Sequence, residues 1–260
     1  MMKLQIAKDA RPQARTLLIA TALTFALWML PYASVLTYPF RLFVTFIHEG
    51  GHALAAVLTG NSVRSLSVSF DTSGTVETLV APGGLFSQLF ISSAGYLGAI
   101  AFGALLLWAI RRRVKARALL AGSALVVAAL TAVFGFVVPL TNFSLQPFTV
   151  LAGVAITVGL LAGARYLGPR AANFLAGFLA VQCVLNAVFD LKGLIYMSVA
   201  TNAPTDAMNM AAATGSPAIM WALMWAGVGF VIVSLALRAY AVARDKPSQP
   251  DLPFEDPLEV

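Results

Sequence analysis

One segment organises this chain: Phe46-Ile47-His48-Glu49-Gly50-Gly51-His52-Ala53-Leu54-Ala55-Ala56. It contains the pattern H-E-x-x-H, with a glycine at both variable positions. Residues four apart lie on one face of a helix, so His48 and His52 can bind one metal ion together. Glu49 follows the first histidine and can accept a proton from metal-bound water without being a ligand. The pattern therefore predicts a metal site with an adjacent general base.

The composition is that of a membrane protein. Of the 260 residues, 59% are hydrophobic and 11% are charged, whereas soluble domains carry about 25% charged residues. Both histidines of the chain lie in the metal motif, inside the apolar segment Tyr38–Leu58, where His and Glu are costly to bury without partners. This setting argues against a chance match. The single cysteine, Cys183, excludes an intramolecular disulfide and a cysteine-rich metal site.

Apolar segments long enough to cross a bilayer recur along the chain. A spanning helix needs about 20 mostly apolar residues, and these segments reach or exceed that length. A short metal-motif helix, Phe40–Leu58, follows the first segment after an expected break at Tyr38-Pro39. The other segments are Thr16–Val35, Phe86–Ile110, Ala118–Leu140, Phe148–Leu167, Ala171–Val199 and Ala218–Tyr240. We expect an all-α polytopic membrane protein of six to seven transmembrane helices. Residues 1–243 should form one integral-membrane domain, and the proline-rich polar residues 244–260 a disordered tail.

A short β-hairpin is expected directly after the metal-motif helix. The segment Ser65–Phe70 alternates polar and apolar residues, Asp71–Gly74 is a turn signal, and Thr75–Leu79 is a second short strand. Because an unpaired strand edge is not tolerated in lipid, the hairpin must lie at the interface or line a protected cavity. We expect it over Asn61–Leu79, near the metal, with one of its edges accepting a substrate strand.

The formal charge of +6 indicates membrane orientation rather than nucleic-acid binding. Basic residues lie at the ends of apolar segments, and no nucleic-acid motif is present. The cluster Arg111–Arg117, the pair Arg165 and Arg170, and the basic residues near the C-terminus fall on one side, which the positive-inside rule makes cytoplasmic. Seven full crossings would place the basic N-terminus on the other side. The conflict disappears if one early segment does not cross.

The third metal ligand should be a carboxylate, because a catalytic zinc has three protein ligands and no histidine remains. Two candidates stay open. Asp190 lies within an apolar helix, where a carboxylate is a functional candidate by default. Asp206 lies in a loop before Ala207–Ala213, where aspartate commonly serves as a helix N-cap. We favour Asp190, with Asp206 as the alternative.

Three further residues are candidates for substrate binding. Asn186 lies one helical turn before Asp190 on the same face and could orient that carboxylate or contact substrate. Gly50 and Gly51 either let neighbouring helices pack closely or clear space beside the metal for a substrate backbone. These two interpretations of the glycines are compatible.

With these residues in view, the chain resembles the site-2 protease family of intramembrane zinc metalloproteases. The specific part is His48-Glu49-Gly50-Gly51-His52-Ala53, followed by the hairpin. The small bacterial branch without a PDZ domain is also similar at Ala94–Gly98 and from Asp206 to Trp221. The chain departs from the family at Asp190, which is followed by Leu191, whereas the family's third ligand is usually in an Asp-Gly pair. The resemblance implies Zn²⁺ as cofactor and a bacterial cytoplasmic membrane as location.

Two functions remain open from the sequence. The first is a zinc endopeptidase that hydrolyses peptide bonds of membrane proteins or peptides within the bilayer. The second is a non-catalytic membrane binding or regulatory protein on the same fold, with a structural metal or none. A structural zinc is closed by four ligands, and the sequence offers three good candidates. A transporter is disfavoured because no internal repeat or paired broken helices are visible. The sequence does not specify the oligomeric state.

Overall fold

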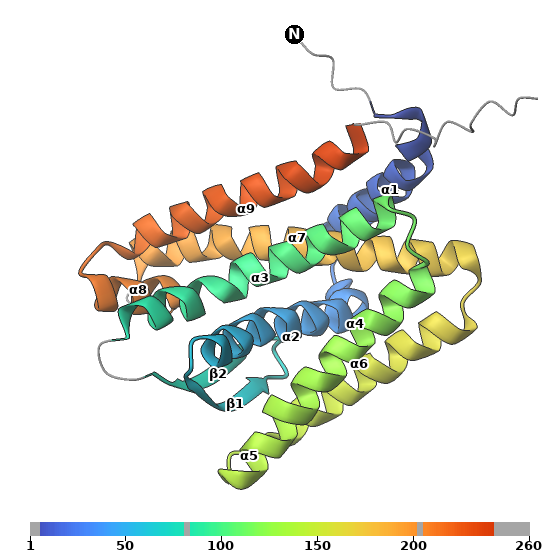
Figure 1. Cartoon of the computed structure of the whole chain (residues 1–260). Helices are drawn as coiled ribbons and strands as arrows, with labels where there is room; N and C mark the ends of the chain where they lie inside the picture. The colour runs from blue at the N-terminus through green and yellow to red at the C-terminus, as the bar shows by residue number, and fades with distance from the viewer. Residues whose placement is uncertain (1–5, 81–83, 202–204, 242–260) are drawn as a thin grey trace, which may run out of the picture.

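A computed structural model of the chain describes residues 6–80, 84–201 and 205–241 (Figure 1). The described part is helical apart from one antiparallel pair of strands, which confirms the expected all-α polytopic membrane fold. The expected single domain over residues 1–243 stays a prediction. The proposed tail, residues 244–260, lies outside the described residues.

The helices follow one another along the chain with short connections. After a 3₁₀ turn at Lys8–Ala10 come α1 (Arg11–Met29), α2 (Ser34–Leu58), α3 (Leu85–Arg111), α4 (Ala116–Leu130), α5 (Val138–Thr141), α6 (Pro147–Tyr166), α7 (Pro169–Ala200), α8 (Asp206–Thr214) and α9 (Ala218–Ala241). A π-helical segment, Thr131–Val137, joins α4 to α5, so that Ala116–Thr141 forms one potential span. The strands are β1 (Ser62–Val68) and β2 (Gly74–Leu79).

Within the described residues, five helices are long and apolar enough to cross a membrane by themselves. They are α3, the α4–α5 segment, α6, α7 and α9. Helices α1 and α2 pass the same test only as a pair, and the chain bends by 119° between them. The total is six if the bent pair forms one span. In that arrangement α1 and α2 do not cross separately, and the N-terminus falls on the same side as the cluster Arg111–Arg117.

The break before the metal-motif helix is four residues wide and lies earlier than expected. The predicted break at Tyr38-Pro39 is wrong, because α2 begins at Ser34 and continues through Pro39. The chain turns at residues 30–33, where Tyr32 adopts a left-handed conformation with φ of 65°. Pro31 cannot donate a backbone hydrogen bond. The proline and the left-handed residue together end α1.

The N-terminal turn and the ends of α3 and α9 meet at one end of the bundle. There Arg111, at the end of α3, bonds to the Asp9 carboxylate at 2.8 Å and to the Ala239 carbonyl at 2.9 Å. The Ala7 amide donates to the Tyr240 carbonyl at 3.1 Å. These contacts bring the start of α1 and the ends of α3 and α9 together (Figure 1). The positive-inside rule predicts that this end is cytoplasmic.

Helix α2 lies at the centre of the bundle and carries the metal motif (Figure 1). Its apolar face is buried through Phe43, Phe46 and Ile47, which are at most 5% exposed. It packs closely on α3, because a Cβ at Gly51 would overlap the backbone carbonyl of Ala94. Small residues permit this kind of close approach between membrane helices. The contact fixes α2 against the beginning of α3.

The hairpin forms where the sequence predicts it, with shifted strand ends. β1 pairs antiparallel with β2 from Ser62↔Leu79 to Val68↔Gly74, and a bulge follows Val63. Phe70, predicted to be in the first strand, lies in the turn and is 76% exposed. At the turn, the amide and hydroxyl of Ser73 both donate to the Asp71 carboxylate. These two bonds hold the pKa of Asp71 below its usual value.

The hairpin turn is fastened to the metal-motif helix by side chains of α2. The Thr45 hydroxyl donates to the Thr72 carbonyl at 2.8 Å, and the Tyr38 hydroxyl donates to the Phe70 carbonyl at 2.7 Å. Gly74, the first residue of β2, lies so close to α2 that a Cβ there would overlap Thr45 and the carboxylate of Glu49. These contacts hold the start of β2 beside the metal motif.

Candidate metal centre

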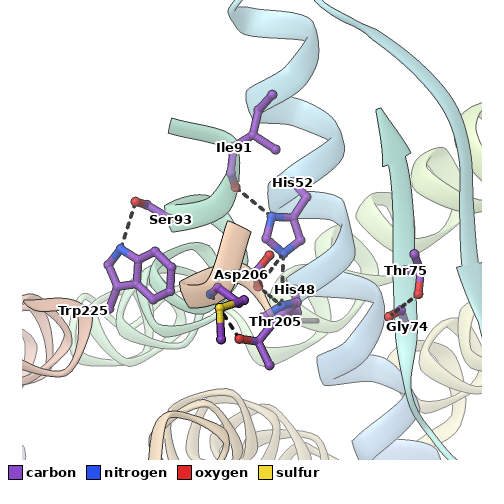
Figure 2. Close-up of polar contacts among 10 residues, drawn as sticks. His48, His52, Gly74, Thr75, Ile91, Ser93, Thr205, Asp206 and Trp225 are labelled. Carbon is purple, nitrogen blue, oxygen red and sulfur yellow. Dashed lines mark hydrogen bonds and ion pairs between the residues drawn. The ribbon is translucent and has the colours of Figure 1, made fainter. Parts of the chain in front are cut away.

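Three potential metal ligands converge from two helices (Figure 2). His48 and His52 project from one face of α2, as their spacing predicts, and Asp206 comes from the first turn of α8. The ligand atoms of the three residues all lie within 4.8 Å of one another. No other group of this kind occurs among residues 6–80, 84–201 and 205–241. The structure thus assembles one candidate metal centre from residues that are about 150 positions apart in the chain.

The spacing of the three ligand atoms fits a tetrahedral zinc ion. Ligand atoms about 2.0–2.1 Å from zinc at tetrahedral angles are roughly 3.3 Å apart. The two imidazole Nε2 atoms are 3.1 Å apart. A carboxylate oxygen of Asp206 lies 3.4 Å from Nε2 of His52 and 3.8 Å from Nε2 of His48. Two imidazoles and one carboxylate are also a common donor set of catalytic zinc.

The orientation of His52 is set by a backbone carbonyl. Nδ1 of His52 lies 2.7 Å from the carbonyl oxygen of Ile91, near the start of α3. A carbonyl can only accept, so Nδ1 carries the proton and Nε2 has its lone pair free for a metal. The residue is 6% exposed, and its ring cannot turn away without losing this bond. The ring is therefore held in the form and direction that metal binding requires.

Asp206 is free to face the histidines because another residue caps its helix. Thr205 is the N-cap of α8, and its hydroxyl accepts from the amide of Met208 at 3.2 Å. Asp206 is the first residue of the helix, one position later than the capping role expected for it. Its carboxylate is turned to His48 and His52 instead. The geometry supports Asp206, the alternative candidate, as the third ligand.

Asp190, the favoured candidate, lies outside this group of three. It lines a neighbouring cavity of about 990 Å³ together with Asn186, Arg41, His48 and Glu49. The side-chain amide of Asn186 donates to the backbone carbonyl of Gln182 at 2.9 Å and to its side-chain oxygen at 2.7 Å. Asp190 and Asn186 thus border the space next to the metal group, on the α7 side. A role of Asn186 in substrate binding stays a prediction.

The two motif glycines face neighbouring helices. A Cβ at Gly50 would overlap the side chain of Leu130 in α4, and one at Gly51 would overlap the backbone of α3. These contacts support the packing interpretation of the two glycines. Their participation in substrate binding stays a prediction.

Sequence reasoning did not single out Gly95 as part of the metal centre. A Cβ at this position of α3 would overlap Nε2 of both His48 and His52. Only glycine therefore lets the backbone of α3 approach the two ligand nitrogens this closely. In the sequence, Gly95 is one of several small residues in a predicted helix. Its role becomes visible only in the tertiary contact with the two histidines.

We expect Gly95→Ala to weaken zinc binding by about 10- to 100-fold, the range found when the surroundings of metal ligands are disturbed. The added methyl group would push the imidazoles out of position. Elemental analysis of the purified variant measures the effect. Gly98→Ala is the matched control, because a Cβ there would meet its nearest neighbour, the Cα of Gly51, at 3.6 Å. Equal zinc content in both variants would contradict this role for Gly95.

Glu49 lies between two cavities that meet at the metal group. It is 6% exposed and lines both the cavity on the α7 side and a second cavity of about 770 Å³ that contains all three ligands. Tyr96, which sequence reasoning had not singled out, lines both as well, and its ring packs edge-on against His48 with the centroids 4.6 Å apart. A water or a substrate group in either cavity can approach the Glu49 carboxylate.

The second cavity is bordered along one side by β2. The cavity lining that includes the three ligands also includes, from β2 and the residue after it, Gly74, Thr75, Val76, Thr78 and Val80. Figure 2 shows this strand beside the helix that carries the histidines. The strand that follows the metal motif in the sequence therefore borders the metal centre in space.

The outer edge of β1 is occupied, whereas the edge of β2 borders the cavity. Val68 exchanges hydrogen bonds with the Thr149 hydroxyl of α6, at 2.9 Å through its amide and 3.2 Å through its carbonyl. Because Val68 uses its backbone groups for Thr149, Val68 and Gly74 form a pair without hydrogen bonds between the two strands. Such pairs recur every two residues along an antiparallel pair of strands, so Leu66 and Val76 form another. The backbone N–H and C=O of Val76 therefore point away from β1, on the side of the cavity.

Comparison with known proteins assigns the chain to a family. The family described as Peptidase M50B-like matches residues 17–236, which include the metal group, the hairpin and the potential spans. The comparisons with curated proteins and with solved structures give no match. The match covers most of the chain and agrees with a His-His-Asp metal group in a bundle of membrane helices. The chain belongs to the Peptidase M50B-like family and is an integral-membrane protein of the site-2 protease family of metalloproteases.

Proposed function

We propose that this protein is an intramembrane zinc endopeptidase that hydrolyses peptide bonds of membrane-associated proteins or peptides. His48, His52 and Asp206 would hold the metal, and Glu49 would act as the general base. The convergence of the three ligand atoms beside a buried glutamate is the observation that carries the proposal. The family and the membrane helices support a bilayer setting for the substrate.

The residues of the site have the properties that peptide hydrolysis needs. When bound, zinc supplies a Lewis acid that polarises the substrate carbonyl and acidifies water. Glu49, one position from His48 on the helix, accepts the proton of the attacking water. It then returns this proton to the leaving amine, so its charge is restored after each turnover. The two cavities that Glu49 lines give room for the substrate chain on both sides of the scissile bond.

The number of ligands favours this proposal over a structural metal site. Structural zinc sites in proteins are closed by four protein ligands, whereas catalytic sites keep one position open. The group found among the described residues has three members and borders a cavity. We therefore retain the non-catalytic alternative only as an outcome of the experiments below.

The edge of β2 is our candidate for substrate binding. A substrate segment must be extended before its peptide bond can be attacked, since a helix hides its backbone in its own hydrogen bonds. Adding such a segment to an exposed strand edge satisfies the backbone groups of both partners. Val76 offers an outward N–H and C=O next to the cavity of the metal group. A substrate strand lying along β2 would pass the Glu49 carboxylate.

We expect Val76→Pro to reduce cleavage about fivefold while zinc content is unchanged. Proline removes the outward N–H, and one hydrogen bond contributes about 1 kcal/mol. The ladder with β1 does not use this N–H, so the hairpin should persist. Cleavage rates at low substrate concentration, compared with Val76→Ala, measure the effect. Full activity of the proline variant would exclude substrate addition at this edge.

A further inference from the structure

A further cavity, separate from the two that border the metal group, lies at the basic end of the bundle. Its volume is about 600 Å³, and it lies between the start of α1, the connection from α3 to α4, and the start of α7. Ile91, which holds His52, is twenty residues before Arg111 on α3, a distance of about 30 Å along the helix. The peptidase mechanism makes no use of this cavity.

Three exposed cations line this cavity, two from the α3–α4 connection and one from the first turn of α4. They are Arg113, Lys115 and Arg117. None of the ion pairs found among residues 6–80, 84–201 and 205–241 includes any of them. Arg117 donates one hydrogen bond to the carbonyl of Leu167, at the end of α6, at 3.2 Å. The three cations thus concentrate positive charge at the cavity.

Arg113 occupies a backbone position that favours glycine. Its φ is 60°, in the left-handed region, at the end of α3. Its amide donates to the Ile110 carbonyl at 2.9 Å, which turns the chain out of the helix. A side chain in this conformation costs about 1 kcal/mol relative to glycine. The local backbone conformation alone therefore disfavours an arginine at this position. Binding of an anion in the cavity by its guanidinium would explain why an arginine is present.

Two helices begin at the cavity without side-chain caps. α4 starts at Ala116 and α7 starts at Pro169, and both residues line the cavity. Neither helix has a side chain bonded to its free amides. Helix N-termini attract anions through these amides and through the helix dipole. The two N-termini add to the field of the three cations.

Part of the cavity lining is apolar, and one acceptor in the lining has no hydrogen-bond partner. Leu17, Ile110 and Val114 line it. The side-chain oxygen of Gln13, also in the lining, is buried and has no hydrogen-bond partner. A buried acceptor without a partner is costly unless a donor reaches it. A ligand with hydroxyl groups would provide that donor.

We propose that this cavity binds the headgroup of an anionic phospholipid that carries hydroxyl groups, of the phosphatidylglycerol type. The phosphate lies against Arg113, Lys115 and Arg117, and a headgroup hydroxyl donates to Gln13. The apolar wall takes the beginning of an acyl chain. Basic pockets between membrane helices on the cytoplasmic side suit such headgroups, and the apolar wall favours a lipid over a free phosphate ion.

The test compares lipid binding by the full-length protein in detergent, measured by native mass spectrometry and by the melting temperature. The additions are dioleoylphosphatidylglycerol, dioleoylphosphatidylcholine and inorganic phosphate. We expect phosphatidylglycerol alone to bind and to raise the melting temperature, since a surface cation contributes about a fivefold factor toward anionic lipid. Equal binding of phosphatidylcholine would overturn the proposal, and so would equal stabilisation by inorganic phosphate.

Variants locate the binding site. Lys115→Gln with Arg117→Gln should weaken phosphatidylglycerol binding about 10- to 30-fold. Arg113→Gly should weaken it while leaving the lipid-free melting temperature unchanged or higher, because glycine tolerates the left-handed backbone. Arg112→Gln is the matched control: it lies in the same connection, but its side chain stacks over Trp108 at 5.0 Å and does not line the cavity. Equal binding by the control and the cavity variants would exclude the site. None of these measurements depends on peptidase activity.

Discussion

Glu49→Gln is expected to retain zinc and fold while peptide hydrolysis falls by about 100- to 10,000-fold, the usual contribution of a general base. Glutamine has nearly the shape of glutamate, so the packing of this buried side chain beside Gly74 survives. It cannot accept and return a proton. A fall of this size corresponds to roughly 3 to 5 kcal/mol of activation free energy.

The measurement is cleavage of a membrane-embedded reporter peptide by zinc-loaded wild type and variant at equal zinc content. Glu77→Gln serves as a matched control, because this glutamate lies on β2 with its side chain exposed. It should cleave at the wild-type rate. Undiminished cleavage by Glu49→Gln would remove Glu49 from the proposed mechanism.

Asp206→Asn is expected to lower zinc affinity by more than about 100-fold, whereas Asp190→Asn should leave it within a fewfold of wild type. Disturbing the surroundings of a metal ligand costs 10- to 100-fold in affinity, and removal of a charged ligand should cost more. The structure places the Asp206 carboxylate 3.4 Å from the ligand nitrogen of His52. Asp190 lies outside the group of three.

Zinc titration with a competing chelator measures both affinities. Asn209→Asp is a useful companion, because Asn209 lines the metal cavity in the same helix and the variant tests whether a carboxylate nearby can restore binding to Asp206→Asn. Equal losses in the Asp206 and Asp190 variants, or a larger loss at Asp190, would contradict the assignment of the third ligand.

The parts of the structure that follow local patterns could be predicted from the sequence. The i, i+4 spacing places His48 and His52 on one face, and α2 presents both to the same cavity. The alternation from Ser65 and the turn signal at Asp71 predict the hairpin, which extends over Ser62–Leu79. Length and apolar composition predict the spans. Each of these signals lies within one short segment.

The third ligand depended on a competition that the sequence does not resolve. The sequence left open whether Asp206 binds the metal or caps α8; in the structure the hydroxyl of Thr205 is the cap, and the Asp206 carboxylate faces the histidines. The apolar sequence around Asp190 indicated a buried carboxylate that would need a metal ion as its partner. In the structure, Asp190 instead lines a cavity that Arg41 also lines. A one-residue shift in the start of a helix thus decides which aspartate reaches the metal group.

The contribution of α3 could not be predicted for a different reason. Gly95 and the Ile91 carbonyl act through backbone approach and backbone hydrogen bonding, and neither has a signature in residue type. The break between α1 and α2 was also misplaced, because Pro39 is a more familiar helix breaker than the left-handed Tyr32. Pro31 and the left-handed Tyr32 end α1, and Pro39 lies within α2.

The most direct test of the account measures zinc content and peptide cleavage on the same purified samples of wild type, Asp206→Asn and Glu49→Gln. We predict one zinc per chain and cleavage of a membrane-embedded peptide for wild type. We predict loss of both zinc and cleavage for Asp206→Asn, and retained zinc without cleavage for Glu49→Gln. Retained zinc in all three proteins, with no cleavage of membrane peptides by wild type, would contradict the account and support a non-catalytic membrane protein.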